Sequence, residues 1–451
     1  MKFLGIGEYC DLGAMYLRLV EAGHEVKVYV ENADHHDIYA GMLSFTPDWR
    51  SELAWIRQAG QEGVILFESA TKGAIQDALR LEGYQVIGGS AFGDRLEGER
   101  EYGQQMMQEM GMSIAKTFQF NDYESAITFI HSTNKRYVYK NNGADFERTR
   151  NYVGMVEDGS DLIALLIHYQ TQSHQNKGYQ SQEDQNQVAK SIVIDFVLME
   201  YISGIEIGVG AYFNGEHFLQ PACLDWEYKH FFPGNLGELT GEMGTVVTYQ
   251  GAEIIFGRTL QHLESRLKES GYCGYINLNM IANAQGLWPL EFTSRFGYPG
   301  YVICAALQQN SWDILFRRML KKSSVYITTK TGFSVGVVLN VPPFPYCHGY
   351  DLLSKGLPIL FKPSFTEADR QHLYLSEAAK IDDYVVTSGM TGNVATAVGC
   401  GETIEDARRG AYDLAEKVIL PNIRYRQDIG NNLIAGDLQQ LIKWGYILGV
   451  N

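Results

Sequence analysis

The chain has 451 residues with 45% hydrophobic and 20% charged side chains, which is typical of a globular protein of roughly two to four domains. Its formal net charge of −16 argues against nucleic acid or an anionic membrane as a partner, because neither is attracted to an acidic surface. Six scattered cysteines without a C-x-x-C pair favour reduced thiols over a zinc site, and without a long apolar run or signal peptide we expect a cytoplasmic protein.

Residues 1–110 are predicted to form an amino-terminal domain built on a parallel sheet. Short apolar runs alternate with amphipathic stretches, which indicates strand–helix–strand units with short connections. The predicted strands are 3–7, 25–30, 64–68 and 85–87, and the predicted helices are 12–21, 74–81 and 97–110.

Residues 111–195 are predicted to form a small subdomain with a strand at 135–140. Within it, residues 169–190 are rich in Gln, Ser and Asn and carry almost no aliphatic side chains. Such a segment cannot bury enough apolar area to offset its ordering entropy, so we expect a mobile loop.

The remaining residues are predicted to form an antiparallel-sheet domain (196–328) and a small carboxy-terminal α/β domain (329–451). Long apolar runs with alternation favour strands that are well buried on one face. The predicted strands are 192–201, 206–213, 275–281, 287–292, 334–341 and 394–398, and a helix is predicted at 405–420. The fold class is therefore α/β, with α+β character in the middle of the chain.

The most informative segment is a predicted hairpin whose strands are joined by a short Asn-Ala-Gln-Gly turn. Because side chains alternate along a strand, Asn279 and Glu291 are expected side by side on one face, with Thr293 two residues on. Oxygen atoms of this kind are the donors that Mg²⁺ prefers. Arg295, on the same face, could hold a carboxylate or phosphate with its planar guanidinium. An ordinary edge hairpin with a solvated glutamate has equal weight for this segment taken alone.

Two further segments carry polar residues at strand ends. Glu200, Tyr201 and Ile202 end a buried strand, and their backbone groups are suited to the edge of an adenine ring. Glu206, beyond a glycine turn, is placed to receive ribose hydroxyls. Lys140 ends another strand, where it could act as a point charge on a phosphate. For either segment alone, a plain strand–turn–strand or a surface lysine is the more common interpretation.

The order of these segments, a lysine strand, Glu-x-x-x-Gly-x-Glu and Glu-x-Thr-x-Arg, is similar to the ATP-grasp signature. The chain resembles phosphoribosylamine–glycine ligases more closely than ATP-grasp enzymes in general. The matching segments, in the family's order, are Leu96-Glu97-Gly98, Lys229 with Thr240-Gly241-Glu242-Met243-Gly244, Leu290-Glu291-Phe292 with Arg295-Phe296-Gly297, Gly401-Glu402-Thr403, and Arg426-Gln427-Asp428-Ile429-Gly430. Five matches in the right order argue against chance.

The resemblance implies an ATP-grasp lid over 111–195 and a nucleotide- and metal-binding domain over 196–328. It also implies an ADP-forming ligase that uses ATP and Mg²⁺ to activate a carboxylate as an acyl phosphate, which an amine then attacks. Combined with the hairpin geometry, it assigns ATP binding to Lys140, Arg148, Arg150, Glu200, Tyr201, Ile202 and Glu206, metal binding to Glu291, Asn279 and Thr293, and catalysis to Arg295 and Lys229.

Departures from the family pattern lie mainly at the amino terminus and in the lid. The glycine-rich lid loop is absent, and a lysine and a metal-binding asparagine are also replaced. The residues that stand at the altered positions are Gly7-Glu8-Tyr9-Cys10-Asp11, Phe67-Glu68-Ser69-Ala70, Gln104, residues 143–150, Thr293, Tyr298 and Gly300.

These departures suggest a changed amine substrate. Glu8, Asp11 and Glu68 would repel a phosphorylated amine, so we expect a less anionic one, and a cationic amine would be attracted. Arg295 and the Phe-Gly after it are kept, so glycine or another small amino acid is the expected carboxylate. Two alternatives stay open: a genuine phosphoribosylamine–glycine ligase, and a nucleotide-binding pseudoenzyme with a regulatory role. We expect a monomer or homodimer acting on small molecules.

Overall fold

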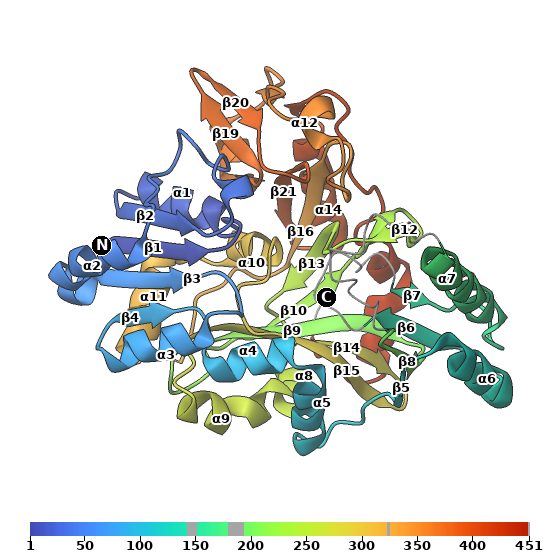
Figure 1. Cartoon of the computed structure of the whole chain (residues 1–451). Coiled ribbons are helices and arrows are strands. Elements are labelled where there is room, and N and C mark those ends of the chain that lie inside the picture. The colour runs from blue at the N-terminus through green and yellow to red at the C-terminus, as the bar shows by residue number, and fades with distance from the viewer. Residues whose placement is uncertain (142–150, 179–193, 323–324, 450–451) are drawn as a thin grey trace. The chain divides into compact units, whose positions relative to one another are not determined.

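The computed structural model describes residues 1–141, 151–178, 194–322 and 325–449. The chain separates into two compact units, a first unit of residues 1–113, 205–237 and 241–451 and a second unit of residues 114–204 and 238–240. Figure 1 labels their elements. Within the described part of the chain, no helix combines the length and the apolar character that a bilayer crossing requires.

A parallel four-stranded sheet opens the first unit, in the order β2-β1-β3-β4 (Figure 1). Its strands and helices are β1 (Lys2–Gly7), α1 (Gly13–Glu21), β2 (Glu25–Val30), α2 (Leu53–Gln58), β3 (Gly63–Phe67), α3 (Gly73–Leu81) and β4 (Gln85–Ile87), which confirms the predicted strands. Every residue of β3 is buried, as expected of a parallel strand covered on both faces. Because β2 and β3 lie on opposite sides of β1, the carboxyl ends of β1 and β3 form a topological switch point, where α/β sheets usually bind ligands.

The predicted helix over 97–110 is confirmed for α5 (Arg100–Glu109), but its first residues belong to a separate helix, α4 (Ala91–Gly98). Glu99 has a φ of −103° and a ψ of 93°, an extended conformation that interrupts the helix. Helix α4, which was not predicted separately, begins at Ala91 because the Ser90 side chain accepts a hydrogen bond from the Gly93 N–H and caps the helix.

An eight-stranded sheet forms the centre of the first unit, in the order β15-β14-β9-β10-β13-β16-β21-β18. Its strands are β9 (Ile205–Phe213), β10 (Cys223–Glu227), β13 (Gly244–Thr248), β14 (Gly274–Asn283), β15 (Gly286–Thr293), β16 (Phe333–Asn340), β18 (Leu373–Leu375) and β21 (Asn393–Gly401). The antiparallel pairing and the overall α/β class confirm the predicted fold. Strands from both predicted ranges, 196–328 and 329–451, belong to this sheet. The sheet itself therefore marks no boundary at 328, and the predicted domain boundary stays a prediction.

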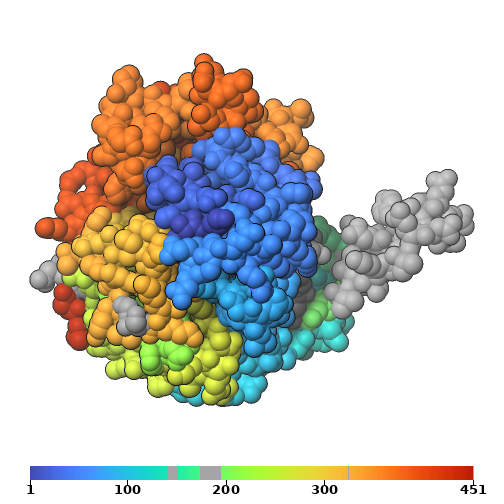
Figure 2. Space-filling model, turned by 90° about the vertical axis from the view of Figure 1, so that its left-hand side faces the viewer, coloured from blue at the N-terminus to red at the C-terminus, as the bar shows by residue number. Residues whose placement is uncertain are grey.

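Helices α10 (Gly300–Leu307) and α14 (Ile404–Ala415) pack on the β16–β21 part of this sheet. Helix α14 ends earlier than predicted, because the chain turns into β22 (Val418–Ile419), which pairs with β17 (Leu360–Phe361). The other short elements are α8 (Glu253–Arg258), α9 (Glu264–Glu269), α11 (Trp312–Lys321), α12 (Tyr350–Leu353), α13 (Glu367–His372), α15 (Leu438–Lys443), β11 (His230–Phe232), β12 (Leu236–Leu239), β19 (Ala378–Ile381) and β20 (Tyr384–Thr387). Figure 2 shows the blue amino-terminal part against the yellow-orange segment that contains α11.

The described residues of the second unit form an antiparallel sheet in the order β5-β8-β6-β7 with two helices. Its elements are β5 (Thr117–Phe120), α6 (Tyr123–Thr133), β6 (Tyr137–Asn141), β7 (Tyr152–Val153), α7 (Ser160–Gly178) and β8 (Phe196–Glu200). Residues 169–178 belong to α7, so the predicted loop is wrong there: Leu162 and Leu166 anchor the start of this helix in the core, and the polar stretch continues it. Residues 179–190, the rest of the predicted loop, lie outside the described residues.

The parallel sheet and the large sheet meet where β14 begins. The Gly88 N–H donates to the Cys273 carbonyl oxygen at 2.8 Å, and a Cβ atom at Gly274 would lie 1.9 Å from the Gly88 carbonyl oxygen. The contact is between two backbones, so neither side can yield by changing a rotamer.

We therefore expect Gly274→Ala to lower the free energy of unfolding by about 1–3 kcal/mol, because the added methyl group forces the two backbones apart. Urea denaturation would measure the loss. Gly98→Ala is the matched control, since a Cβ atom at Gly98 meets nothing within 4 Å, and it should be neutral or slightly stabilising in a helix. Equal stability of the two variants would contradict the close approach.

Candidate active site

A glycine in β9 lets polar side chains of its two neighbouring strands meet across it. The register places Gly208 between Asn279 of β14 and Asp225 of β10. A Cβ atom at Gly208 would lie 2.2 Å from Asp225 Oδ1, so no side chain fits there. The side-chain amide of Asn277 donates across β9 to Asp225 Oδ2 at 2.6 Å. The strands β14, β9 and β10 thus present one continuous polar face.

Lys229, in the connection between β10 and β11, reaches the same face. Its Nζ lies 2.7 Å from Glu206 Oε1, 3.3 Å from Glu227 Oε2 and 3.6 Å from Glu291 Oε1. Burial alone would lower the pKa of Lys229, but the three carboxylates together raise this pKa well above its usual value. The lysine is therefore a fixed positive charge at neutral pH.

The hairpin places its predicted polar residues side by side, as the alternation of side chains implied. Asn279 is directly opposite Glu291, and Asn277 is directly opposite Thr293. The Nδ2 atom of Asn279 donates to Glu227 Oε2 at 2.9 Å. Only the carbonyl oxygen of this amide is chemically able to ligate a metal. The metal-binding roles of Asn279, Glu291 and Thr293 stay predictions.

Two acids that share this environment were missed by the sequence analysis, Asp225 and Glu227, and a third, Glu242, was named there only as part of a matching segment. Burial, followed by the Glu227 carboxylate, raises the pKa of Asp225 well above its usual value. The same two causes raise the pKa of Glu242 to about 8, and the Thr245 hydroxyl donates a hydrogen bond to this carboxyl group. Two signals were present in the sequence, the alternation Cys-Leu-Asp-Trp-Glu and the glutamate within Thr240-Gly241-Glu242-Met243-Gly244.

Arg295, predicted to hold the carboxylate substrate, is positioned by α4. Its Nε donates to Glu97 Oε1 at 3.0 Å, and its Nη1 donates to the Phe296 carbonyl oxygen at 3.4 Å. The backbone N–H of Ser294 donates to Glu97 Oε2 at 2.8 Å, so one carboxylate fixes both residues. Burial raises the pKa of Asp11 to about 6, and the Arg295 charge acts against this rise, which places the two side chains in one electrostatic environment.

Glu68 occupies the switch point at the carboxyl ends of β1 and β3. Its Oε2 accepts the backbone N–H of Asp11 at 2.9 Å, and the N–H of Leu12 also donates to this carboxyl group. Glu68 is only 2% exposed, and burial, followed by the Asp11 carboxylate, raises its pKa to about 8. The Glu68 side chain thus accepts backbone N–H groups just before α1, where an anionic ligand would otherwise bind.

The residues predicted to bind adenine lie in the second unit, at the end of β8. Glu200 pairs with Lys135 at 3.0 Å, and the Arg136 guanidinium lies 3.4 Å from the centroid of the Tyr201 ring. Ile202 follows in the connection to β9. The side chains of Glu200 and Tyr201 are thus engaged inside the second unit, and the predicted role of the three residues' backbone groups toward adenine stays a prediction.

Lys140 does not share a face with Glu200. The β6–β8 pairing places Lys140 opposite Val197 and Tyr137 opposite Glu200. Since side chains alternate along a strand, the lysine and the glutamate point to opposite faces of the sheet. Two predicted ATP-binding residues lie outside the described residues: Arg148 and Arg150.

The sequence matches a known enzyme family in its central part. Residues 98–301 match the family described as phosphoribosylglycinamide synthetase, ATP-grasp (A) domain. The phosphoribosylamine–glycine ligase of Thermotoga maritima is 27% identical over 350 residues, which cover 74% of this chain and 77% of that protein. The enzyme of the same name from Listeria monocytogenes is 24% identical over 404 residues, with 87% of each chain covered.

Solved structures show the same fold. The crystal structure of the Thermotoga maritima phosphoribosylamine–glycine ligase superposes with a TM-score of 0.67 at 22% identity, covering 95% of this chain and 100% of that one. The biotin carboxylase domain of the Hydrogenobacter thermophilus 2-oxoglutarate carboxylase, solved with MgADP and bicarbonate, has a TM-score of 0.60 at 11% identity, covering 94% and 91%.

The raised pKa of Glu68 predicts a pH-dependent stability. A carboxyl group with a folded pKa of about 8 and a usual value of 4.5 stabilises the folded state below pH 4.5, and this contribution is lost as the pH rises toward 8. A glutamine keeps the shape and cannot ionise. We therefore expect Glu68→Gln to gain melting temperature relative to the wild type as the pH rises from 5 to 8.5.

Thermal melts of both proteins across this range would test the expectation. Glu25→Gln, at an exposed position in the same sheet, is the control and should keep a constant difference from the wild type. A Glu68→Gln difference that also stays constant with pH would show that Glu68 is ionised in the folded protein.

Proposed function

We infer that the chain, an ATP-grasp ligase with a phosphoribosylglycinamide synthetase domain over residues 98–301, uses ATP and Mg²⁺ to join a carboxylate to an amine. A carboxylate oxygen attacks the γ-phosphorus of ATP and ADP leaves, which gives an acyl phosphate. The amine nitrogen then attacks the acyl carbon, phosphate leaves, and the nitrogen loses a proton to give the amide. No nucleophilic side chain is required.

The observation that carries this proposal is the position of Lys229 among Glu206, Glu227 and Glu291. A fixed ammonium beside carboxylates can neutralise negative charge that develops on a transferring phosphoryl group. Arg295, held by Glu97, is suited to bind the substrate carboxylate through its guanidinium.

The oxygen donors of the same face fit Mg²⁺. Glu291, Glu227 and the carbonyl oxygen of Asn279 are hard donors with the negative charge that this ion needs, and they would hold it. When bound, Mg²⁺ neutralises phosphate charge and orients the phosphates. Thr293 offers a further hydroxyl on this face, and the protein's own contribution is to keep these oxygens in register across β9.

Glu291→Gln keeps the side-chain shape but removes the charge, so ADP release should fall by about a hundredfold or more, since several kcal/mol of charge stabilisation is lost. Asn279→Ala should be nearly as harmful, because it also releases Glu227, whereas Thr293→Ala should be milder. The assay is ADP release from Mg·ATP with glycine and an amine panel. Glu253→Gln, at an exposed position in α8, is the control with wild-type activity. Equal tolerance at all three hairpin positions would exclude a metal site here.

We further propose that the amine is less anionic than phosphoribosylamine. Glu68 already accepts the N–H groups of Asp11 and Leu12 before α1, so a phosphate group cannot use these two donors. With a pKa of about 8 Glu68 is mostly protonated at neutral pH, so it excludes a phosphate by occupying the site rather than by charge repulsion. Asp11, with a pKa of about 6, and Glu8 supply the negative charge that attracts a cationic amine.

A panel of amines with glycine as the carboxylate would test this. We expect a neutral amine or a diamine to support ADP release, and phosphoribosylamine made in situ to support little, because its phosphate cannot displace Glu68. Efficient turnover with phosphoribosylamine would overturn the proposal and establish the purine-type ligase. ADP release with no substrate pair, despite a melting-temperature increase with Mg·ATP, would favour a nucleotide-binding pseudoenzyme.

A further inference from the structure

We propose that Arg426 is a positioning residue for Lys229, acting from behind the connection between β10 and β11. Arg426 belongs to the Arg-Gln-Asp-Ile-Gly segment near the carboxyl terminus, far from Lys229 in the sequence. All the contacts that place Arg426 behind Lys229 lie within the first unit. The effect of Arg426 on catalysis rests on the proposed function.

The residues on either side of Lys229 face this carboxy-terminal segment. Tyr228 continues the β10–β13 pairing, because its N–H donates to the Gly244 carbonyl oxygen at 2.9 Å and its own carbonyl oxygen accepts the Met243 N–H at 2.8 Å. Since side chains alternate along an extended chain, Tyr228 points away from the face that Lys229 occupies. The Arg426 guanidinium lies 5.0 Å from the centroid of the Tyr228 ring.

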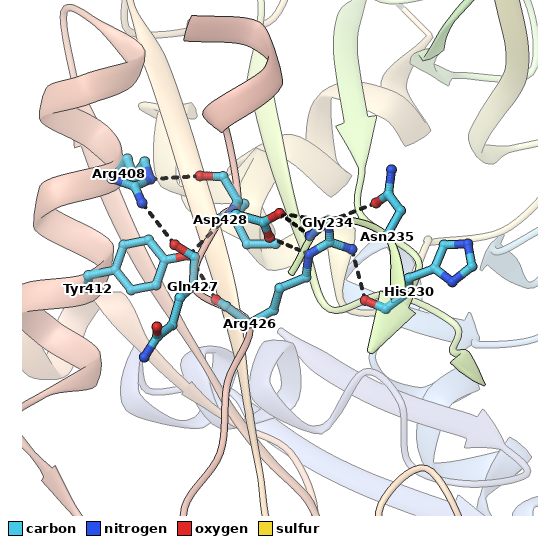
Figure 3. Close-up of polar contacts among 9 residues, drawn as sticks. His230, Gly234, Asn235, Arg408, Tyr412, Arg426, Gln427 and Asp428 are labelled. Carbon is cyan, nitrogen blue, oxygen red and sulfur yellow. Dashed lines mark hydrogen bonds and ion pairs between the residues drawn. The ribbon is translucent and has the colours of Figure 1, made fainter. Parts of the chain in front are cut away.

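Arg426 binds the other neighbour of Lys229 directly. Its Nη1 donates to the His230 carbonyl oxygen at 2.9 Å, and its Nη2 donates to Asn235 Oδ1 at 2.7 Å, as Figure 3 shows. The Arg426 side chain is 1% exposed. One buried guanidinium therefore holds both the first residue of β11 and the turn between β11 and β12, and a planar fork with several donors is the group suited to this.

Asp428 completes the contact from the same segment. Its Oδ1 lies 2.5 Å from Arg426 Nε, and its Oδ2 accepts the Gly234 N–H at 2.8 Å. Burial raises the pKa of Asp428, but the hydrogen bonds from Arg426 and Gly234 hold it below its usual value. Gly234 has a φ of 71° and Asn235 a φ of 56°, a left-handed turn that this carboxylate stabilises.

Helix α14 binds the backbone of the segment that contains Arg426 and Asp428. Arg408 donates to the carbonyl oxygens of Gln427 at 2.8 Å and of Ile429 at 3.0 Å, and the Tyr412 hydroxyl donates to the Arg426 carbonyl oxygen at 2.8 Å (Figure 3). The guanidinium is thus anchored to a helix that packs on the large sheet. Without the Arg426 guanidinium, the His230 carbonyl oxygen and the Asn235 side chain lose their hydrogen-bond donor. The connection that carries Lys229 then loses its support.

Lysine labelling tests the geometric part without a substrate. The intact protein would be treated with a low concentration of acetic anhydride at pH 8, and acetylation of Lys229 followed by peptide mass spectrometry. Ion pairing keeps Lys229 slow to react in the wild type. In Arg426→Ala we expect its labelling to be about tenfold faster, because the connection that carries Lys229 loses its support and opens more often, which separates the ammonium from its carboxylate partners.

Two controls are built into the chain. Arg409→Ala removes an exposed arginine of α14 that pairs only with Asp406 among the described residues, and it should leave Lys229 labelling unchanged. Lys268, ion-paired with Glu216, should react at one rate in all variants. Wild-type labelling of Lys229 in a folded Arg426→Ala protein would overturn the proposal. If Arg426→Ala does not fold, Arg426→Lys is used, and an unchanged labelling rate there would overturn it equally.

Kinetics then test the catalytic consequence. Arg426→Ala should lower kcat for ADP release by about a hundredfold, the loss expected when a catalytic group moves by about 1 Å. If Arg426 acts through Lys229, the double variant should lose no more than Lys229→Ala alone, whereas independent losses would multiply and contradict the positioning role. A wild-type protein that releases no ADP would sink the proposed function instead, and the labelling result would still decide the position of Lys229.

Discussion

Charge neutralisation of the Lys229 ammonium by Glu206, Glu227 and Glu291 is the interaction on which the candidate site depends. These three acids come from β9, β10 and β15, so the ion pairs form only when three strands are in register. A buried lysine without such partners would lose its charge, and the acids without it would repel one another. Gly208 makes the arrangement possible, because a side chain in the middle strand would separate the groups that must meet.

The large sheet and the parallel sheet of the first unit hold their acidic side chains in opposite ways. On the large sheet, three glutamates face Lys229. In such a cluster a glutamate could exchange the lysine for a metal ion, and the lysine could exchange a glutamate for a phosphate. At the switch point of the parallel sheet, Glu68 Oε2 accepts the Asp11 N–H, and the side chain is closed to solvent. The large sheet thus offers charged groups that a ligand could bind, whereas at the switch point a side chain of the protein already uses backbone donors.

The sequence predicted those features whose partners are close in the chain. Asn279 and Glu291 were paired correctly because a short turn fixes the register of their hairpin. Asp225 and Glu227 were missed because their approach to the hairpin depends on β9 lying between two strands that are distant in sequence. Apolar runs predicted the parallel strands, but polar composition alone gave the wrong answer for residues 169–178, since a helix anchored at its start can continue through polar residues.

The bond between Arg426 and the His230 carbonyl oxygen joins positions 196 residues apart. A ribosome releases the amino-terminal end first, so the sheet that carries Lys229 can assemble while the segment that supports it has not yet been made. A nascent chain interrupted before Arg426 has every acid around the lysine but lacks the contacts behind it. Translation through Arg426 is therefore a condition for this set of contacts, and a product that stops before Arg426 would carry Lys229 on an unsupported connection.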